Sequence, residues 1–419
     1  MIKNFLQNRL FVYVVYSFYI LSLGFFNISC EDELKSIHIR SSINHVQPMT
    51  GIVLWEELNH KNTDAIQLEY SYMRYNDVVK EKGIYDWSVV EKKLNSSASR
   101  SHQAIMRFWD TYPGRESAVP DYIKKLHDYH GVVAKSENRD TGFPDWSNTE
   151  YQRFMLEFFE KFAERYDRDP RLAFLEVGFG LWSEYHIYDP GEILGTNFPS
   201  MEFQAKYFKH LANVFKELPW MISEDAHLES RTPFASQPEL LDLKFGIFDD
   251  SFYRAWEPGY NLDGWKFFGM ERFKESPVGG EITFRQKERS DYVDSNWVKE
   301  TRHFGITFMI CEQWLRWISI DRIRANSMVC GYKFKVTDFK ANNSTSRVTV
   351  ENTGVAPLYY DAYITVNGVR SLKSLKYLQP GESAQYMVKS GGQNPILTIE
   401  CDRLVPGQII EYAAELDAK

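Results

Sequence analysis

The feature that most constrains the fold is a series of short apolar runs, separated by longer helical stretches, between residues 49 and 325. Each run has the length and composition of a β-strand. Strands that alternate with helices form parallel sheets, and eight of them close a (β/α)8 barrel. We therefore expect an α/β TIM barrel with strands at 49–55, 65–73, 103–109, 172–179, 219–224, 243–249, 276–282 and 304–310.

The clearest helix lies between the third and fourth runs, in SNTEYQRFMLEFFEKFAERYDRDP (147–170). Ser147 and Glu150 have the spacing of a capping box at its start. Large apolar side chains then repeat along one face: Tyr151, Phe154, Met155, Phe158, Phe162 and Tyr166. Such a face packs on the outside of a barrel, so we interpret it as core and not as a cofactor site.

After Arg324 the pattern changes to short alternating strands with turn signals, including the hairpin pair Asn367-Gly368. This pattern predicts a small all-β, immunoglobulin-like sandwich. We divide the chain into a signal peptide (1–30), a TIM-barrel domain (31–325) and a β-sandwich domain (330–419).

The N-terminal segment reads as a secretory signal, with Lys3 and Arg9 ahead of an apolar stretch from Leu10 to Phe26. The following NISC resembles a bacterial lipobox, which makes Cys30 the expected lipidation site, although Asn27 stands where an apolar residue is commoner. The acidic residues after Cys30 resemble a sorting signal for the outer face of the outer membrane. We expect an extracytoplasmic, membrane-anchored protein; an uncleaved signal anchor is the alternative.

Charge and cysteine content exclude several kinds of partner. The formal net charge of −8 argues against a nucleic-acid ligand and is compatible with neutral sugars. Aromatic residues make up 16% of the chain, and serve either as sugar-binding platforms or as core. Cys311, Cys330 and Cys401 lack metal-ligand spacing, so we expect no metal and no cofactor. A Cys330–Cys401 disulfide is possible, and buried free thiols are the favoured reading.

Two glutamates follow the predicted strands at the end where TIM barrels place their chemistry. Glu184, in GLWSEYH, comes just after the fourth run, and Glu281, in PVGGE, ends the seventh. Glycoside hydrolysis needs one protonated and one ionised carboxyl group on either side of the bond that is cut. We predict that Glu184 and Glu281 form this catalytic pair, with Gly279 and Gly280 allowing a sugar ring to approach closely.

Other strand-end residues are candidate substrate-binding groups. Asp249, Asp250 and Glu312 are rival catalytic carboxylates, although paired aspartates at a strand end more often serve as anchors or caps. His186 either orients Glu184, contacts substrate, or plays a supporting role. The predicted substrate-binding set is Arg74, Arg107, Trp109, Asp110, Trp182, His186, Asp249, Asp250 and Trp314.

The placement of the two glutamates resembles the large clan of retaining glycosidases that includes β-galactosidases, cellulases and β-glucuronidases. In that clan the glutamate after strand four is the acid/base and the one at strand seven is the nucleophile, which implies these roles for Glu184 and Glu281. More closely, the segments MRYNDVVKEKGIYDWSVVEKKL, RFWDTYPG, RYDRDPRLAFLEVGFGLWSEYH, GIFDDSF, PVGGE and NTGVAPLYYDAYI resemble an uncharacterised bacterial family of glycosidase-like barrel lipoproteins with a C-terminal β-sandwich.

One position departs from the clan, which usually has an asparagine before the acid/base that binds the sugar 2-hydroxyl; here it is Ser183. Three hypotheses follow. The first is a retaining glycoside hydrolase, and the second is a surface glycan-binding protein that has lost turnover, which Ser183 favours. The third makes the sandwich the functional part, but its strands show no aromatic row or acidic cluster.

Overall fold

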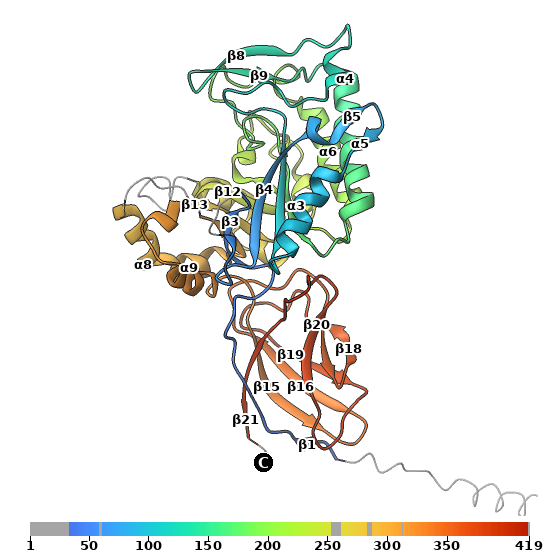
Figure 1. Cartoon of the computed structure of the whole chain (residues 1–419), viewed down its shortest axis with the longest axis vertical. Coiled ribbons are helices and arrows are strands. Elements are labelled where there is room, and N and C mark those ends of the chain that lie inside the picture. Colours follow the sequence, from blue (N-terminus) through green and yellow to red (C-terminus); the bar gives the residue numbers. More distant parts are fainter. Residues whose placement is uncertain (1–32, 58–60, 253–260, 283–286, 312, 418–419) are drawn as a thin grey trace, which may run out of the picture.

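The main body of the chain is a closed barrel of eight parallel strands (Figure 1). The computed structural model describes residues 33–57, 61–252, 261–282, 287–311 and 313–417. Every strand overlaps one of the predicted runs, so the TIM-barrel prediction is confirmed. In order around the barrel the strands are β3 (Gly51–Trp55), β4 (Leu68–Arg74), β7 (Gln103–Trp109), β10 (Leu172–Glu176), β11 (Trp220–Ser223), β12 (Gly246–Phe252), β13 (Val278–Ile282) and β14 (Phe308–Ile310).

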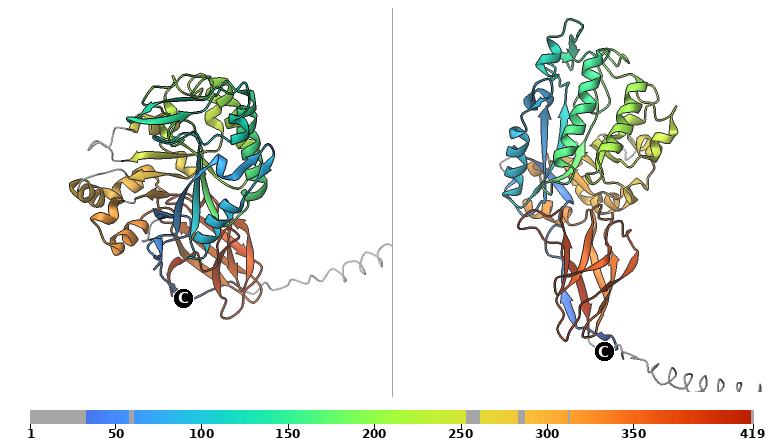
Figure 2. Two further views of the ribbon diagram at one scale, coloured as in Figure 1. Left: turned by 45° about the horizontal axis from the view of Figure 1, so that its top comes forward. Right: turned by 90° about the vertical axis from the view of Figure 1, so that its right-hand side faces the viewer.

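Helices surround the barrel, and Figure 2 shows them on its outer side. The α-helices are α2 (Tyr75–Val78), α3 (Ser88–Ala98), α4 (Asp121–Lys124), α5 (Thr149–Tyr166), α6 (Met201–Val214), α7 (Leu262–Phe268), α8 (Lys287–Phe304) and α9 (Ile320–Ser327). Short 3-10 helices are η2 (Glu224–His227), η3 (Pro238–Asp242), η4 (Arg272–Lys274) and η5 (Gln313–Arg316). Two hairpins, β5 (Val79–Glu81) with β6 (Ile84–Tyr85) and β8 (Val132–Ser136) with β9 (Arg139–Phe143), extend from the loops.

Helix α5 has the predicted buried face but a different cap. All six predicted side chains are buried. The N-cap is Asn148, whose side-chain oxygen accepts a hydrogen bond of 3.0 Å from the backbone N–H of Tyr151. The hydroxyl of Ser147 instead donates to Asp145 at 2.5 Å. Asparagine is as good a cap as serine, so the helix begins one residue later than the capping-box reading implied.

The C-terminal strands form two facing sheets. One contains β15 (Phe334–Ala341), β16 (Ser346–Asn352), β19 (Ser383–Val388) and β21 (Tyr412–Leu416), and the other contains β17 (Ala362–Val366), β18 (Val369–Ser374) and β20 (Leu397–Cys401). Both sheets contribute to one buried core. The backbone at Asn367 and Gly368 has positive φ angles of 51° and 78°, as a tight hairpin turn requires, and joins β17 to β18.

The chain ahead of the barrel also belongs to the sandwich sheet. Strand β1 (Lys35–Ser36) pairs with β15, and β2 (Ile39–Ser41) pairs with β21. The sequence division at 31–325 therefore assigned to the barrel a segment that pairs elsewhere. The physical reason is that β2 covers the open edge of β21 and β1 adds to β15, and strands this short can pair without an apolar signature of their own.

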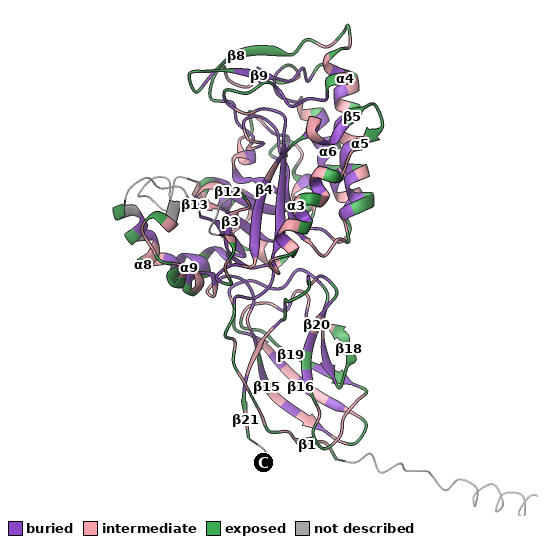
Figure 3. Ribbon diagram, viewed as in Figure 1, coloured by how far each residue is buried: buried purple, intermediate pink, exposed green. Residues whose placement is uncertain are grey.

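The sandwich packs against the amino end of the barrel. The hydroxyl of Tyr360 donates to the carbonyl oxygen of Ala173 at 2.5 Å, and the guanidinium of Arg403 donates to the carbonyls of Asp167 and Leu172 at 3.0 and 3.2 Å. One buried cluster runs from the barrel interior into the sandwich, and Figure 3 shows the buried strands on both sides. The carboxyl ends of the barrel strands therefore face away from the sandwich.

The three described cysteines, Cys311, Cys330 and Cys401, are free and buried, as the favoured reading expected. Within the described ranges, no helix has both the length and the apolar character needed to cross a bilayer. Cys30 lies outside the described residues.

Arg403 and Arg370 provide a matched test of the interface between barrel and sandwich. Arg403 is 8% exposed and its loss leaves barrel carbonyls without a donor, whereas Arg370 pairs with Glu400 and Asp402 at the surface. We expect Arg403→Met to lower the free energy of unfolding by about 2–3 kcal/mol and Arg370→Met by less than about 1 kcal/mol. Urea titration followed by tryptophan fluorescence measures both free energies of unfolding. Equal decreases in the two variants would show that the contacts of Arg403 with the barrel do not stabilise the protein.

Candidate active site

A single buried arginine organises the carboxyl end of the barrel. Arg107, on β7, is 1% exposed. Its Nη1 donates to Glu184 Oε1 at 2.9 Å and its Nη2 donates to Asp250 Oδ1 at 2.7 Å. Its Nε and Nη2 both reach Glu176 Oε2, at 2.9 and 2.5 Å, and Nη1 also donates to the hydroxyl of Tyr72 at 2.9 Å. The guanidinium therefore binds three carboxyl groups at once.

These groups meet because of strand register. Tyr72 on β4 and Glu176 on β10 are both register partners of Arg107, one on each side of β7. Side chains alternate along a strand, so Arg107 lies in the barrel interior above Ile105, and Glu176 lies above Phe174. The guanidinium carbon lies 4.1 Å from the ring centre of Phe248 on β12. The polar layer thus rests directly on the apolar filling of the barrel.

One cation cannot balance three buried carboxylates, so the cluster retains a proton. Burial raises the pKa of Glu184 well above its ordinary value; the nearby charges of Asp250 and Glu281 raise it further, against the opposing effect of Arg107. Burial also raises the pKa values of Glu176 and Asp250, with Arg107 again opposing. Protonated Glu184 donates a hydrogen bond to Asp250. Glu184 consequently keeps its proton to higher pH than an ordinary glutamate, while its side chain remains 13% exposed.

The turn that carries Glu184 is held in an uncommon backbone conformation. Trp182, Ser183 and Tyr185 have positive φ angles of 53°, 65° and 64°. The turn is tied to β7, because Ser183 Oγ donates to the carbonyl of Phe108 at 2.7 Å and the carbonyl of Trp182 accepts from Arg107 at 3.3 Å. The hydroxyl of Ser183 thus bonds to the protein's own backbone. It holds the turn in place, which differs from the sugar contact expected of an asparagine at this position. Non-glycine residues in this conformation cost free energy and tend to occur at functional sites.

Glu281 lies at the carboxyl end of β13, half-buried, and close enough to Glu184 for its charge to act on that pKa. The two glycines before it are required by packing. A Cβ at Gly280 would lie 2.1 Å from the carbonyl oxygen of Asp249, and one at Gly279 would lie 2.7 Å from that of Phe308. Their role is close contact between neighbouring strands, which differs from the substrate approach we expected.

The paired aspartates of β12 have different surroundings. Asp249 is 1% exposed and accepts hydrogen bonds from Trp265 Nε1 at 2.8 Å, Asn261 Nδ2 at 2.5 Å and the backbone N–H of Ser251 at 3.0 Å. Burial nevertheless raises the pKa of Asp249 to about 7. Asp249 therefore holds the start of α7 against β12, whereas Asp250 contacts Arg107 and Glu184.

Other predicted residues lie outside this cluster. Arg74 is exposed and forms an ion pair of 2.6 Å with Asp77. Asp110 is buried and accepts from Tyr151 and from Thr111, and burial raises its pKa to about 6. Its contacts fix the loop after β7. Trp314 lies in η5, but its side chain, like the whole of Glu312, is outside the described residues.

His186 lies next to Glu184. Its Nδ1 lies 2.8 Å from Asp225 Oδ2, and its Nε2 lies 3.9 Å from Glu184 Oε2. Trp182 packs edge-on against the imidazole, with ring centres 5.7 Å apart. Trp109 is 7% exposed and packs against Tyr112 at 5.2 Å. These predicted residues form one neighbourhood beside Glu184.

Sequence reasoning missed four residues of this region: Tyr72, Glu176, Glu224 and Asp225. A signal existed for each. Glu176 is a lone acid inside an apolar strand, and Tyr72 is two residues after Tyr70, so both tyrosines point into the barrel. Glu224 and Asp225 are a pair of acids directly after β11, just as Asp249 and Asp250 are a pair at the end of the sixth run. Burial raises the pKa of Glu224 well above its ordinary value, with the charges of Asp249 and Asp225 adding to the effect.

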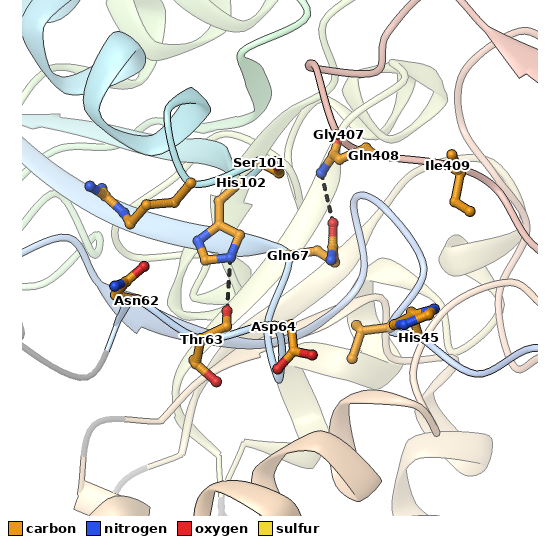
Figure 4. A pocket seen from close by; sticks show the side chains of 12 residues that line it. His45, Asn62, Thr63, Asp64, Gln67, Ser101, His102, Gly407, Gln408 and Ile409 are labelled. Carbon is orange, nitrogen blue, oxygen red and sulfur yellow. Dashed lines mark hydrogen bonds between the residues drawn. The ribbon is translucent and has the colours of Figure 1, made fainter.

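A polar pocket of about 620 Å³ lies at the opposite end of the barrel, where it meets the sandwich (Figure 4). Its polar groups are largely bound to one another: Gln408 Nε2 donates to Gln67 Oε1 at 2.9 Å, and His102 Nε2 lies 3.0 Å from the carbonyl of Thr63. The buried carboxylate of Glu69 accepts from Arg100 and His102 behind the pocket wall. This region holds the two domains together, so we do not place the site there.

Comparisons with known proteins give limited likenesses. No protein-family model and no curated protein matches the sequence. Among solved structures, the GH36 alpha-galactosidase AgaA from Geobacillus stearothermophilus is 10% identical, with 81% of this chain and 55% of that chain covered and a TM-score of 0.40. This chain thus spans about half the length of that protein. A GH5_18 protein from Bifidobacterium longum subsp. infantis is 9% identical, with 64% and 70% covered and a TM-score of 0.44. Another, from Streptomyces cattleya and in complex with Manb1-4GlcNAc, is 8% identical, with 64% and 71% covered and a TM-score of 0.43.

Among the described residues, no group of three or more His, Cys, Asp or Glu side chains is arranged to hold a metal ion. The donors and acceptors of the Arg107 cluster are bound to one another instead. What this arrangement can do chemically is hold a proton on Glu184 next to other carboxyl groups.

The Arg107 cluster makes a stability prediction. Replacing Arg107 by methionine leaves three carboxyl groups buried without a cation, and we expect the free energy of unfolding at neutral pH to fall by about 3–5 kcal/mol. Arg74→Met, which breaks an exposed ion pair, should cost less than about 1 kcal/mol. Adding Glu176→Gln to Arg107→Met should restore part of the loss.

Chemical denaturation of the four proteins measures these differences. The cost of Arg107→Met should shrink in acid, since protonation removes the uncompensated charges. An Arg107→Met protein as stable as Arg74→Met at neutral pH would show that the cluster is not a buried charge network.

Proposed function

We propose that this protein is a glycoside hydrolase that acts with retention of configuration on an extracellular oligo- or polysaccharide. The observation that supports this most is a largely buried glutamate, Glu184, bound to Arg107 at the carboxyl end of a TIM barrel, with a second glutamate, Glu281, close enough to raise its pKa. Retaining glycosidases need this combination of one acid and one nearby carboxylate.

In the proposed reaction Glu184 protonates the glycosidic oxygen while the carboxylate of Glu281 attacks the anomeric carbon. The bond to the leaving sugar breaks, and a covalent ester links the remaining sugar to Glu281. Glu184, now ionised, takes a proton from water, whose oxygen attacks the anomeric carbon and releases Glu281. The enzyme returns to its starting protonation state.

Arg107 and Asp250 have supporting roles in this scheme. Asp250 accepts the hydrogen bond of protonated Glu184, and its charge helps to keep the proton there. Arg107 binds Glu184 Oε1 at 2.9 Å and so stabilises the carboxylate that forms once the proton has left. The two neighbours thus favour opposite states of the acid, which suits a group that must both give and take a proton.

We further propose that the protein works outside the cytoplasm, anchored through a lipid on Cys30, with the carbohydrate as its partner. The N-terminal signal-like segment and its lipobox-like residues support this placement.

A second candidate function is capture of glycan without turnover. The observation that favours it is Ser183, whose hydroxyl is bound to the carbonyl of Phe108 and so does not replace the sugar contact of the clan's asparagine.

Substitution of the two glutamates tests the proposal. On a broad panel of glycans we expect Glu184→Gln to lower kcat by about 10²–10⁴-fold and Glu281→Gln to abolish turnover, because each removes one half of the acid–nucleophile pair. Glu150→Gln, on the outer face of the barrel in α5, is the matched control and should keep full activity. Proton NMR of the first product should show the anomer of the substrate.

The outcomes separate the two functions. Glycan binding by the wild type that survives both substitutions, with no product formed, would favour the capture protein. A product of inverted configuration would contradict the assignment of Glu281 as the nucleophile.

The pH profile tests the role of Asp250. The alkaline limb of kcat/KM reports loss of the proton from Glu184. Asp250→Asn removes a negative charge that raises the pKa of Glu184, so the alkaline limb should move to lower pH. Rates measured between about pH 4 and about pH 9 would show this. A limb that stays in place, or moves to higher pH, would mean that Asp250 does not hold the proton on Glu184.

A further inference from the structure

His186 has a buried ring nitrogen that the protein does not satisfy. The residue is 3% exposed, its Nδ1 is bonded to Asp225, and among the described residues its Nε2 has no hydrogen-bond partner. With the proton on Nδ1, Nε2 offers a lone pair; in the charged ring it offers an N–H. A buried nitrogen needs a partner in either state, and a hydroxyl group can serve both because it donates and accepts.

Tyr188 packs on His186 and is exposed to solvent. Its ring stacks on the imidazole of His186, with centres 4.2 Å apart and planes 26° apart, and half of the residue is exposed. Trp182 also contacts His186, edge-on with ring centres 5.7 Å apart, and Tyr112 packs against Trp182 at 6.0 Å, so the four rings form a row. An aromatic row that starts beside Glu184 and ends at an exposed ring provides apolar faces of the size of a sugar ring.

His186 and Tyr188 lie on the same segment after β10 as the acid Glu184, whereas Glu281 ends β13, three strands from β10 in barrel order. In the proposed reaction the oxygen that Glu184 protonates leaves with the departing sugar. Side chains next to Glu184 and away from Glu281 are therefore placed to contact that sugar.

We propose that His186 and Tyr188 form the subsite that holds the leaving sugar, with His186 Nε2 bonded to a ring hydroxyl and Tyr188 against the apolar face of the same ring. The ligand is a pyranose unit of a neutral oligosaccharide, since the side chains around this subsite, Asp225 and Glu184 among them, are acidic. This inference rests on the proposed function and adds to it the residues that choose the leaving group.

The test compares two substrates that share the cleaved sugar. One is an oligosaccharide, whose leaving group is a sugar, and the other is the matching glycosyl fluoride, whose leaving group is fluoride. We expect His186→Ala and Tyr188→Ala each to lower the ratio of the two kcat/KM values by at least about 10-fold. Tyr188→Phe should recover most of the ratio because it keeps the ring. His210→Ala, in α6 with its Nε2 bonded to Leu156, should leave the ratio unchanged.

A ratio that is unchanged in both alanine variants overturns the subsite while leaving hydrolysis intact. If the wild type binds cello-, manno-, xylo-, galacto- or chito-oligosaccharides without cleaving them, the proposed hydrolase is wrong and calorimetry on the same variants tests the subsite. An affinity weakened by at least about 10-fold then supports it, and an unchanged affinity overturns it. If the wild type neither cleaves nor binds any of these sugars, both proposals are overturned. Because Tyr188 is half exposed, Tyr188→Ala stays informative even if His186→Ala does not fold.

Discussion

The carboxyl end of this barrel depends on the ion pairs of Arg107. A guanidinium that is almost fully removed from water needs its charge balanced and its donors bonded, and Glu176, Glu184 and Asp250 provide both. Three carboxyl groups exceed what one cation can balance, so repulsion among the carboxyl groups gathered around Arg107 makes their full ionisation unfavourable. The raised pKa of Glu184 thus comes from its burial and from the charges of Asp250 and Glu281, while Arg107 opposes it.

The geometry of the turn follows from the same contact. Arg107 bonds the carbonyl of Trp182 and the carboxyl of Glu184, while Ser183 between them is fixed to Phe108 on the strand that carries Arg107. Each bond fixes a different part of the turn against β7. Together they hold three non-glycine residues at positive φ, which an unsupported loop would not keep. A serine is short enough to reach the strand carbonyl, so its presence reflects the shape of this turn.

The sequence predicted the barrel and part of the site for the same reason: strand order and alternation are local properties. Period two places Arg107 inside β7, and chain order places Glu184 and Glu281 at the same end. It could not show which carboxyl groups meet Arg107, because that depends on the register of strands far apart in the chain. Arg74 illustrates the limit: it continues the inward parity of Tyr70 and Tyr72, but β4 ends there and the side chain turns to Asp77.

The free-energy cost of burying acidic side chains near this site depends on pH. Asp110 and Asp249 are buried beside it, and burial raises their pKa values to about 6 and about 7 from an ordinary 3.8. An acid whose pKa is raised by folding favours the native state below its unfolded pKa, and this contribution is lost as pH rises through the folded value. The loss therefore falls between about pH 4 and about pH 7. The hydrogen bonds from Tyr151, Thr111, Trp265 and Asn261 limit it, and without them the carboxyl groups that frame the site would be still less compatible with neutral pH. Hydrogen bonds that look purely structural thus limit the free-energy cost of burying Asp110 and Asp249 near this end of the barrel.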